Sequence, residues 1–185
     1  MNIYGFLGFV CGVAVSVLLV WVLLRRFNTD GKTKTEYDER QKVTRGVGFM
    51  YAFYVLAAWV VVLIAIDMME VKLPVTDTVL YFTGIVVSGL FLSWYCIMHD
   101  AYWGMNSNVK FYTRFLIAIG ALNIIAGIGE IVSGDMVVDG VLSNLFINFE
   151  AGILILGIGV FLLIKKHRDG KDSAEDDDEV TESGI

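Results

Sequence analysis

The chain has few of the residues that metal sites and hydrolytic active sites require. It contains two cysteines and two histidines in 185 residues, and they do not assemble into a convincing zinc or haem site. Neither a GxxxxGK phosphate loop nor an HExxH motif is present. No serine nucleophile has a plausible base, because the two histidines, His99 and His167, both lie at the predicted cytosolic border of the membrane. We therefore predict a protein that is not an enzyme and binds no metal or cofactor.

Polar residues are scarce outside residues 28–45 and the segment after Lys165. Hydrophobic residues make up 56% of the chain, against roughly 45 to 50% in soluble domains. Five stretches reach the length of about 20 apolar residues that a transmembrane helix needs: residues 3–24, 47–66, 78–98, 111–132 and 141–164. The sequence therefore predicts an all-α integral membrane protein with five transmembrane helices in residues 1–166, and the lipid bilayer as its surroundings.

Acidic residues concentrate at the C-terminal end of the chain. The net charge of −6 comes largely from residues 175–179, so it describes a tail and does not indicate a nucleic-acid partner. Residues 167–185 have few apolar side chains to bury, and such segments stay unfolded. We predict an acidic, disordered tail.

Basic residues are almost absent from the second and fourth joints between the predicted helices, where Lys72 is the exception. The other thirteen fall in the first joint (residues 25–46), in the third joint and after the last helix: Arg25, Arg26, Lys32, Lys34, Arg40, Lys42, Arg45, Lys110, Arg114, Lys165, Lys166, Arg168 and Lys171. Because Lys and Arg flanking membrane helices stay in the cytosol, this pattern places the N-terminus outside and the C-terminus in the cytosol.

The first predicted helix carries Gly8, Gly12 and Ser16 at four-residue spacing. Small residues at this spacing let two helices approach closely in lipid, either within the monomer or along a homo-oligomer contact. The two cysteines, Cys11 and Cys96, differ in predicted depth by roughly 15 Å, whereas a disulfide tolerates a Cα separation of about 7 Å. We predict free, buried thiols.

The cytosolic joint before residue 47 has the signals of a helix start. Thr35 stands three residues before Asp38, a permissive match to a capping box. Acid-before-base pairs at i, i+4 follow, Glu36 with Arg40 and Asp38 with Lys42, in the order that stabilises a helix. We predict that the helix begins near Glu36. A solvated helical extension would explain these charges without any binding role.

Carboxylates and amides interrupt the last two apolar stretches. The fourth predicted helix places Gly120, Asn123, Gly127, Glu130 and Gly134 on one face, which should look into the protein. Glu150 lies about nine residues, or roughly 13 Å, from the outer end of the fifth helix, level with Asn123, and Asn144 is level with Glu130. We expect Glu150 to pair with Asn123 and Glu130 to pair with Asn144.

Asn148 falls on a different face of the fifth helix from Glu150. Two faces with polar residues predict that this helix is central in the bundle or contacts another subunit. No Lys or Arg at similar depth neutralises Glu150, and burial disfavours its charged form. Ionisable groups within membranes are functional candidates, but a neutral Glu bonded to Asn is also a sound structural clasp. Both interpretations stay open.

Two stretches, EYDERQKVTRGVGFMYAF and CIMHDAYWGMN, resemble small multi-pass membrane proteins of Gram-positive bacteria with no assigned function. The resemblance implies a bacterial plasma-membrane protein and carries over no catalytic role. It also indicates a cytosolic contact for a protein partner, at Asp38, Glu39, Arg40, Gln41 and Asp100. The sequence thus leaves two hypotheses: an assembly or regulatory component that acts through its cytosolic face, and a small proton- or cation-coupled transporter or channel that uses Glu150.

Overall fold

The computed structural model describes residues 3–182, with side chains from residue 13 to residue 169 apart from those of residues 14 and 16. Within that range the chain forms five helices and one short hairpin, and the protein is 74% helical. The mostly helical fold class is therefore confirmed. The elements are α1 (Ile3–Phe27), α2 (Glu39–Met68), α3 (Asp77–Met98), α4 (Val109–Ser133), β1 (Val137–Val138), β2 (Val141–Leu142) and α5 (Phe146–Glu182).

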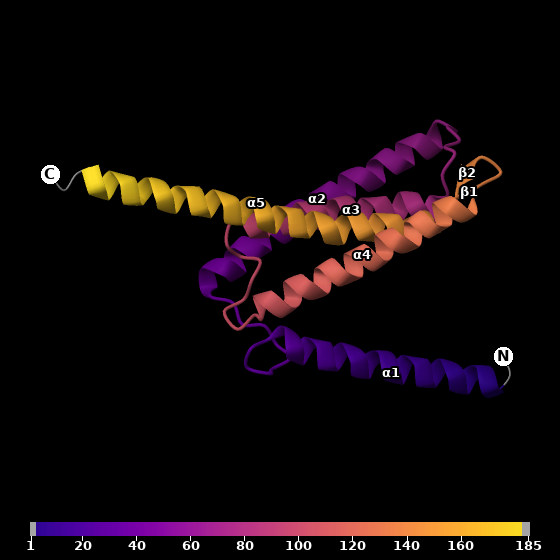
Figure 1. Ribbon diagram of the computed structural model, residues 1–185. Helices are drawn as coiled ribbons and strands as arrows, with labels where there is room; N and C mark the ends of the chain where they lie inside the picture. The colour runs from indigo at the N-terminus through magenta and orange to yellow at the C-terminus, as the bar shows by residue number, and fades with distance from the viewer. Residues whose placement is uncertain (1–2, 183–185) are drawn as a thin grey trace.

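Four helices form one packed unit, and α1 stands apart from it (Figure 1). Helix α5 packs against both α3 and α4, and α2 packs on the other side of α3. Of the two explanations predicted for the polar faces of the fifth helix, a central position and a contact with another subunit, the packing agrees with the first. Helix α1 touches the unit near its C-terminal end, where Phe27 packs against Phe111, Tyr112 and Phe115 of α4.

The outer surface of the helices is apolar. Among the described residues, α2, α3, α4 and the part of α5 up to Asp169 are long and apolar enough to cross a membrane. Only 6% of the apolar window of α2 is buried inside the protein, so most of its hydrophobic side chains face outward. An aqueous protein rarely exposes an apolar patch of this extent, and lipid is the solvent that such a surface fits. Helix α1, which covers the first predicted stretch, has 25 residues.

Small residues bring α4 and α5 close together. Gly120 and Gly127 of α4 are buried, and a Cβ at Gly127 would lie 3.0 Å from Phe149 of α5. Gly152 of α5 lies in turn against the backbone of Ile124. The predicted inward face of α4 is thus confirmed at Gly120 and Gly127. It is wrong at Gly134, which is exposed and follows the last residue of the helix as its left-handed C-cap. Residues without a side chain let two helices pack closely, as small residues do in a bilayer.

Helix α2 begins three residues later than expected. Its N-cap is Asp38, whose carboxylate accepts from the backbone N–H of Gln41 at 2.6 Å, while the Gln41 side chain accepts from the N–H of Asp38. The capping box predicted at Thr35 and Asp38 is therefore wrong. Asp38 is a stronger N-cap residue than threonine, and it fixes the start of the helix.

The later start of α2 also changes the ion pairs of residues 32–42. The predicted helical pairs of Glu36 with Arg40 and Asp38 with Lys42 are wrong, because residues before Glu39 are outside the helix. Lys42 pairs instead with Glu39 at 2.6 Å, and Lys32 pairs with Glu36 at 2.8 Å.

Residues 141–145, predicted as the start of the last helix, belong to a hairpin and a turn instead. Val137 and Val138 pair with Leu142 and Val141 around an Asp139–Gly140 turn in which both residues have positive φ, the backbone that two-residue hairpins favour. Helix α5 then continues to Glu182, past residue 164 and through the segment predicted to be disordered. Disorder of that tail stays a prediction.

Of the two cysteines predicted to be free, buried thiols, only Cys96 has a described side chain. Cys96 is a free, buried thiol, as predicted. The surroundings of Cys11, Gly8, Gly12 and Ser16 are outside what the structure describes, and the homo-oligomer contact proposed for the last three stays a prediction.

Candidate functional site

The loop between α1 and α2 (residues 28–38) and the loop between α3 and α4 (residues 99–108) lie at the same end of the bundle and are bonded together. We call them the loop cap. Two backbone bonds join the loops directly: Thr29 N donates to Asn106 O at 2.8 Å, and Met105 N to Glu36 O at 2.8 Å. A third joins the second loop to the end of α1, where Asn108 N donates to Phe27 O at 2.6 Å. The two sequence stretches singled out by the resemblance therefore meet through folded loops.

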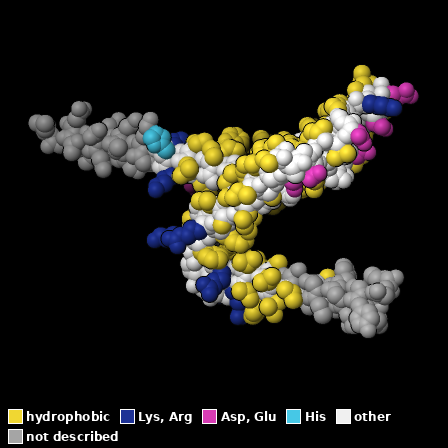
Figure 2. Space-filling view, turned by 45° about the vertical axis from the view of Figure 1, so that its right-hand side comes forward, with side chains coloured by type: hydrophobic (Ala, Val, Ile, Leu, Met, Phe, Trp, Pro, Cys, Tyr) yellow, Lys and Arg dark blue, Asp and Glu magenta, His cyan; other side chains and the backbone are white. Residues whose placement is uncertain are grey.

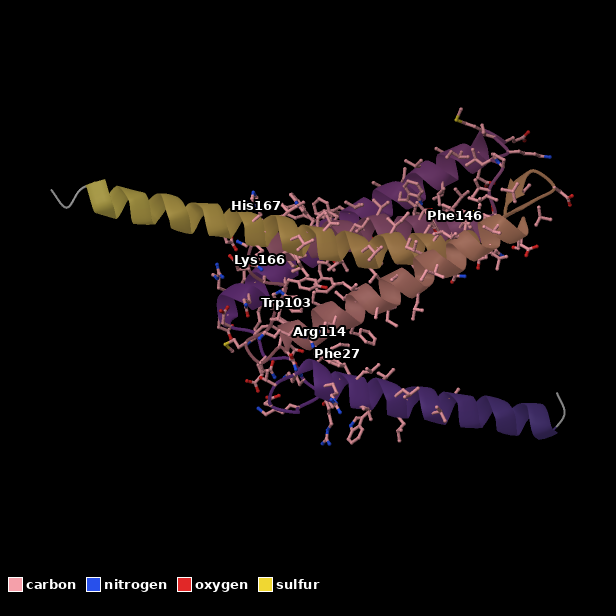
Figure 3. The ribbon with its side chains drawn as sticks, viewed as in Figure 1. Phe27, Trp103, Arg114, Phe146, Lys166 and His167 are labelled. Carbon is pink, nitrogen blue, oxygen red and sulfur yellow. The ribbon has the colours of Figure 1, made fainter. Side chains whose placement is uncertain are left out.

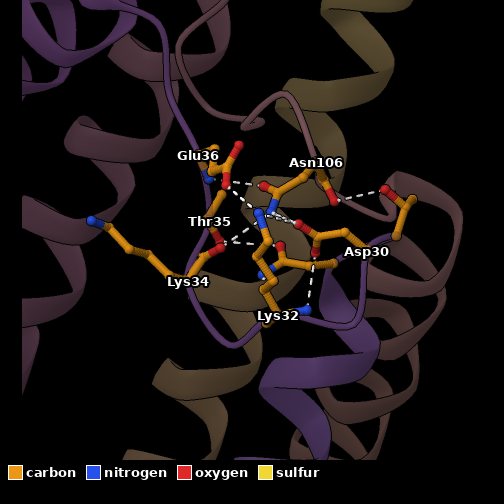
Figure 4. Close-up of polar contacts among 8 residues, drawn as sticks. Asp30, Lys32, Lys34, Thr35, Glu36 and Asn106 are labelled. Carbon is orange, nitrogen blue, oxygen red and sulfur yellow. Dashed lines mark hydrogen bonds and ion pairs between the residues drawn. The ribbon is translucent and has the colours of Figure 1, made fainter.

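Asn106 lies at the centre of the loop cap and is only 8% exposed. Its side-chain oxygen accepts from the backbone N–H of Glu36 at 2.8 Å. Its side-chain nitrogen donates to the carbonyl of Lys34 and to the carboxylate of Asp30, each at 3.1 Å (Figure 4). One amide thus joins three points of the opposite loop, a role that the sequence analysis missed.

Charges surround this centre. The backbone N–H of Lys32 donates to Asp30 at 3.0 Å and holds the pKa of that carboxyl below its usual value, with smaller contributions from the Asn106 amide and the Lys32 ammonium. A lowered pKa means that the charged carboxylate stabilises the fold at neutral pH. This contribution is lost as the pH falls through the folded-state pKa of Asp30, so acid should weaken the loop cap.

Two of the five predicted contact residues hold the loop cap in place. The side-chain nitrogen of Gln41 donates to the carbonyls of Asp100 and Trp103, each at 3.0 Å, and Asp38 caps α2. The Asp100 carboxylate lies 3.2 Å from the ammonium of Lys165. Glu39 and Arg40 are exposed, and neither bridges the two loops in the described contacts.

Arg45 is a further link that the sequence analysis did not identify. Its guanidinium donates to the carbonyl of Ala101 at 3.1 Å and lies over the ring of Tyr37, 4.2 Å from the centroid. Burial raises the pKa of Tyr37, which keeps this ring neutral. Arg45 lies in the second turn of α2, four residues after Gln41, and helical spacing alone could have predicted that both side chains face the same loop.

The intramembrane carboxylates have other partners than predicted. Glu150 is 6% exposed, and Thr83 of α3 is its hydrogen-bond partner. Asn123 donates to the carbonyl of Ile119 in its own helix at 2.9 Å. The predicted pair of Glu150 and Asn123 is therefore wrong, because side chains at equal depth can face different neighbours.

The second pairing is also wrong. Asn148 donates to Glu130 at 2.7 Å, whereas Asn144 accepts from Thr76 at 2.7 Å. Helix α5 starts at Phe146, so Asn144 is in the turn before it and turns toward the start of α3. Asn148 and Glu150 lie on different faces of α5, as predicted, one toward α4 and one toward α3.

These two contacts clasp the central helix on both sides. Among the described side chains, Glu130 Oε2 and Glu150 Oε2 are buried without a hydrogen-bond partner. Each carboxyl group thus joins two helices through one oxygen. The two carboxyl groups have separate partners, Asn148 for Glu130 and Thr83 for Glu150.

The architecture defines a helical protein with four helices that fit a membrane, a folded polar cap at one end, and a central helix clasped by buried carboxyl groups. No protein-family model, curated protein or solved structure matches the chain.

Proposed function

We propose that this is a non-enzymatic protein of the bacterial plasma membrane, with five spans and the loop cap in the cytosol, and that the cap is a docking surface for an assembly or regulatory partner. The charge distribution supports the orientation. Figure 2 shows most of the visible Lys and Arg side chains at the end that carries the loops, and one basic side chain among the Asp and Glu side chains at the other end. Carboxylates are present at the loop end as well, among them Asp30, Glu36 and Asp100. Basic residues flanking membrane helices favour the cytosol.

One observation carries the docking proposal: the loop cap fixes the first turn of α2 while leaving its charges exposed. Asp38 and Gln41 hold this turn, and Glu39 and Arg40 point into solvent beside them. A fixed, charged surface suits a protein partner, since complementary charges direct association and exclude wrong partners.

We expect the double variant Glu39→Lys, Arg40→Glu to lose the partner while the cap stays folded. Both residues are exposed, so the exchange reverses the local charge pattern and keeps the net charge. The measurement is recovery of co-purifying protein after cross-linking in native membranes, and a loss of at least about tenfold is expected from reversed charges at an interface.

The control exchanges two charges at the opposite end of the bundle, Glu70→Lys with Lys72→Glu. Recovery should equal that of the unmodified protein. If the cap variant recovers its partner as well as the control does, the docking surface lies elsewhere.

A second function has one observation in its favour. Glu150 is buried in the apolar region with one oxygen unpartnered, as a proton- or cation-coupling residue would be. Flux of protons and monovalent cations into liposomes, with and without Glu150→Gln, tests this hypothesis. The docking proposal expects no flux that depends on Glu150, and flux abolished by this variant but retained by Glu130→Gln would favour transport.

A further inference from the structure

A groove opens between α4 and α5 at the end of the bundle that carries the loop cap. Its volume is about 780 Å³. Apolar residues of three helices line it, and six of them are Ile97 of α3, Val109 and Ile117 of α4, and Leu156, Val160 and Leu163 of α5. The groove therefore presents hydrocarbon to the lipid phase over several turns of two helices.

Charged and aromatic residues line the same groove where it reaches the loop cap. Lys165 and Lys166 come from α5, and Tyr102 and Trp103 come from the cap. Figure 3 shows Lys166, Trp103 and Arg114 at this end of the bundle. Cations and aromatic rings at the end of an apolar helix are typical of the level of lipid headgroups.

The two lysines have different surroundings. The Lys165 ammonium lies between the Asp100 carboxylate at 3.2 Å and the Asp169 carboxylate at 2.9 Å, which also line the groove. These contacts hold Lys165 in place. Lys166 is exposed, and the nearby cations Lys110, Arg114 and Arg168 are exposed as well. Lys110, Arg114 and Arg168 do not line the groove, but each is adjacent in sequence to a lining residue. They add positive charge beside the two lining lysines and the two lining carboxylates.

Gly159 widens the groove. A Cβ built at Gly159 would meet no atom within 4 Å, although this residue lies in the middle of α5 and lines the groove. The space beside the helix is thus open at the depth of lipid acyl chains.

From this geometry we propose that the groove is a binding site for one anionic phospholipid of the leaflet on the cap side. One acyl chain lies along the apolar walls and passes Gly159, and the phosphodiester group lies at Lys166. The lipid is chosen by charge and shape together, because an acyl chain alone gains little by leaving a bilayer of similar polarity.

Filling the groove tests the acyl-chain part of the proposal. Gly159→Leu places a side chain in the groove at a position where the Cβ itself meets no atom within 4 Å. Gly129→Leu on α4 is the matched control, because a Cβ there is equally free and the residue does not line the groove. Native mass spectrometry of the purified protein, with phosphatidylglycerol added at low molar ratio, measures the bound lipid. We expect about tenfold weaker retention for Gly159→Leu, as for an overfilled apolar site, and no change for Gly129→Leu.

A second pair of variants tests the headgroup part. Lys166→Gln should lower retention of phosphatidylglycerol about fivefold, the effect of one Lys near an anionic surface. It should weaken retention of phosphatidylcholine with the same chains by less, because the choline cation of that lipid offsets the charge of its phosphodiester group. Lys72→Gln at the opposite end removes the same charge and should change neither lipid.

Three outcomes would overturn the proposal. They are equal retention of the two lipids by the unmodified protein, equal effects of Gly159→Leu and Gly129→Leu, and a lipid-free dimer that Gly159→Leu converts to a monomer. The last would make the groove a contact between two copies of the chain.

Discussion

Replacing Asn106 with alanine is expected to lower the free energy of unfolding by about 3 kcal/mol, because the change removes three hydrogen bonds of a buried amide, each worth about 1 kcal/mol. The substitution removes the acceptor for the Glu36 N–H and the donor to the Lys34 carbonyl. It also removes a donor to Asp30. The partners Asp30, Lys34 and Glu36 are exposed, so the expected loss is the sum of the three hydrogen bonds.

Unfolding in mixed detergent micelles, followed by circular dichroism as the fraction of SDS is raised, measures this loss. Hydrogen exchange should also become faster at the Glu36 amide, since its acceptor is gone. Asn108→Ala is the control: Asn108 caps α4 by accepting from Phe111 at 3.2 Å, and loss of a single N-cap costs about 1 kcal/mol. Equal losses from the two variants would show that Asn106 does not hold the loop cap together.

The meeting of the two loops could be anticipated from the sequence, but its central residue could not. Alternation of apolar stretches and joints puts both loops at one end of the bundle, whatever the packing. Asn106 bonds largely to backbone atoms, those of Lys34 and Glu36, which every residue type carries. Nothing in the local sequence distinguishes it from Asn108, two residues later.

Helix existence was predictable because lipid demands a length of apolar sequence, and the four helices that fit a membrane lie over four of the five predicted stretches. The ends of the helices were harder to predict, because several neighbouring residues could each serve as the cap. Asp38 rather than Thr35 caps α2, and the Asp139–Gly140 turn holds residues 141 and 142 in a strand although they are as apolar as the helix that follows.

The depth of a side chain along the bundle could be predicted from the sequence, but the neighbouring helix toward which it points could not. The rise of a helix places Glu150 and Asn123 at one level, but the rotation of each helix about its axis decides which neighbour a side chain meets. Thr83 of α3 meets Glu150 instead. Threonine is common in apolar helices, where its hydroxyl can bond its own backbone, so its presence alone did not indicate a partner for the carboxyl group.

Removing the Glu150 side chain should destabilise the bundle, whereas exchanging it for glutamine should not. Thr83 Oγ1 lies close to Glu150 Oε1 and also 2.8 Å from the carbonyl of Val79, yet a hydroxyl has one proton. The Thr83 hydroxyl can bond the Val79 carbonyl and still accept from a protonated Glu150 or from the amide of glutamine. We expect Glu150→Gln to change the free energy of unfolding by less than about 1 kcal/mol, and Glu150→Ala to lower it by about 3 kcal/mol through the cavity and the lost bond.

Double-mutant cycles in the same micelle titration identify the partner of Glu150. A cycle of Thr83→Val with Glu150→Ala should give a coupling energy of about 1 kcal/mol, the usual size for a hydrogen bond between membrane helices. A cycle of Asn123→Ala with Glu150→Ala should give almost none, since Asn123 bonds its own helix. Coupling to Asn123 and not to Thr83 would contradict the clasp between α3 and α5, and with it the structural role of the carboxyl group.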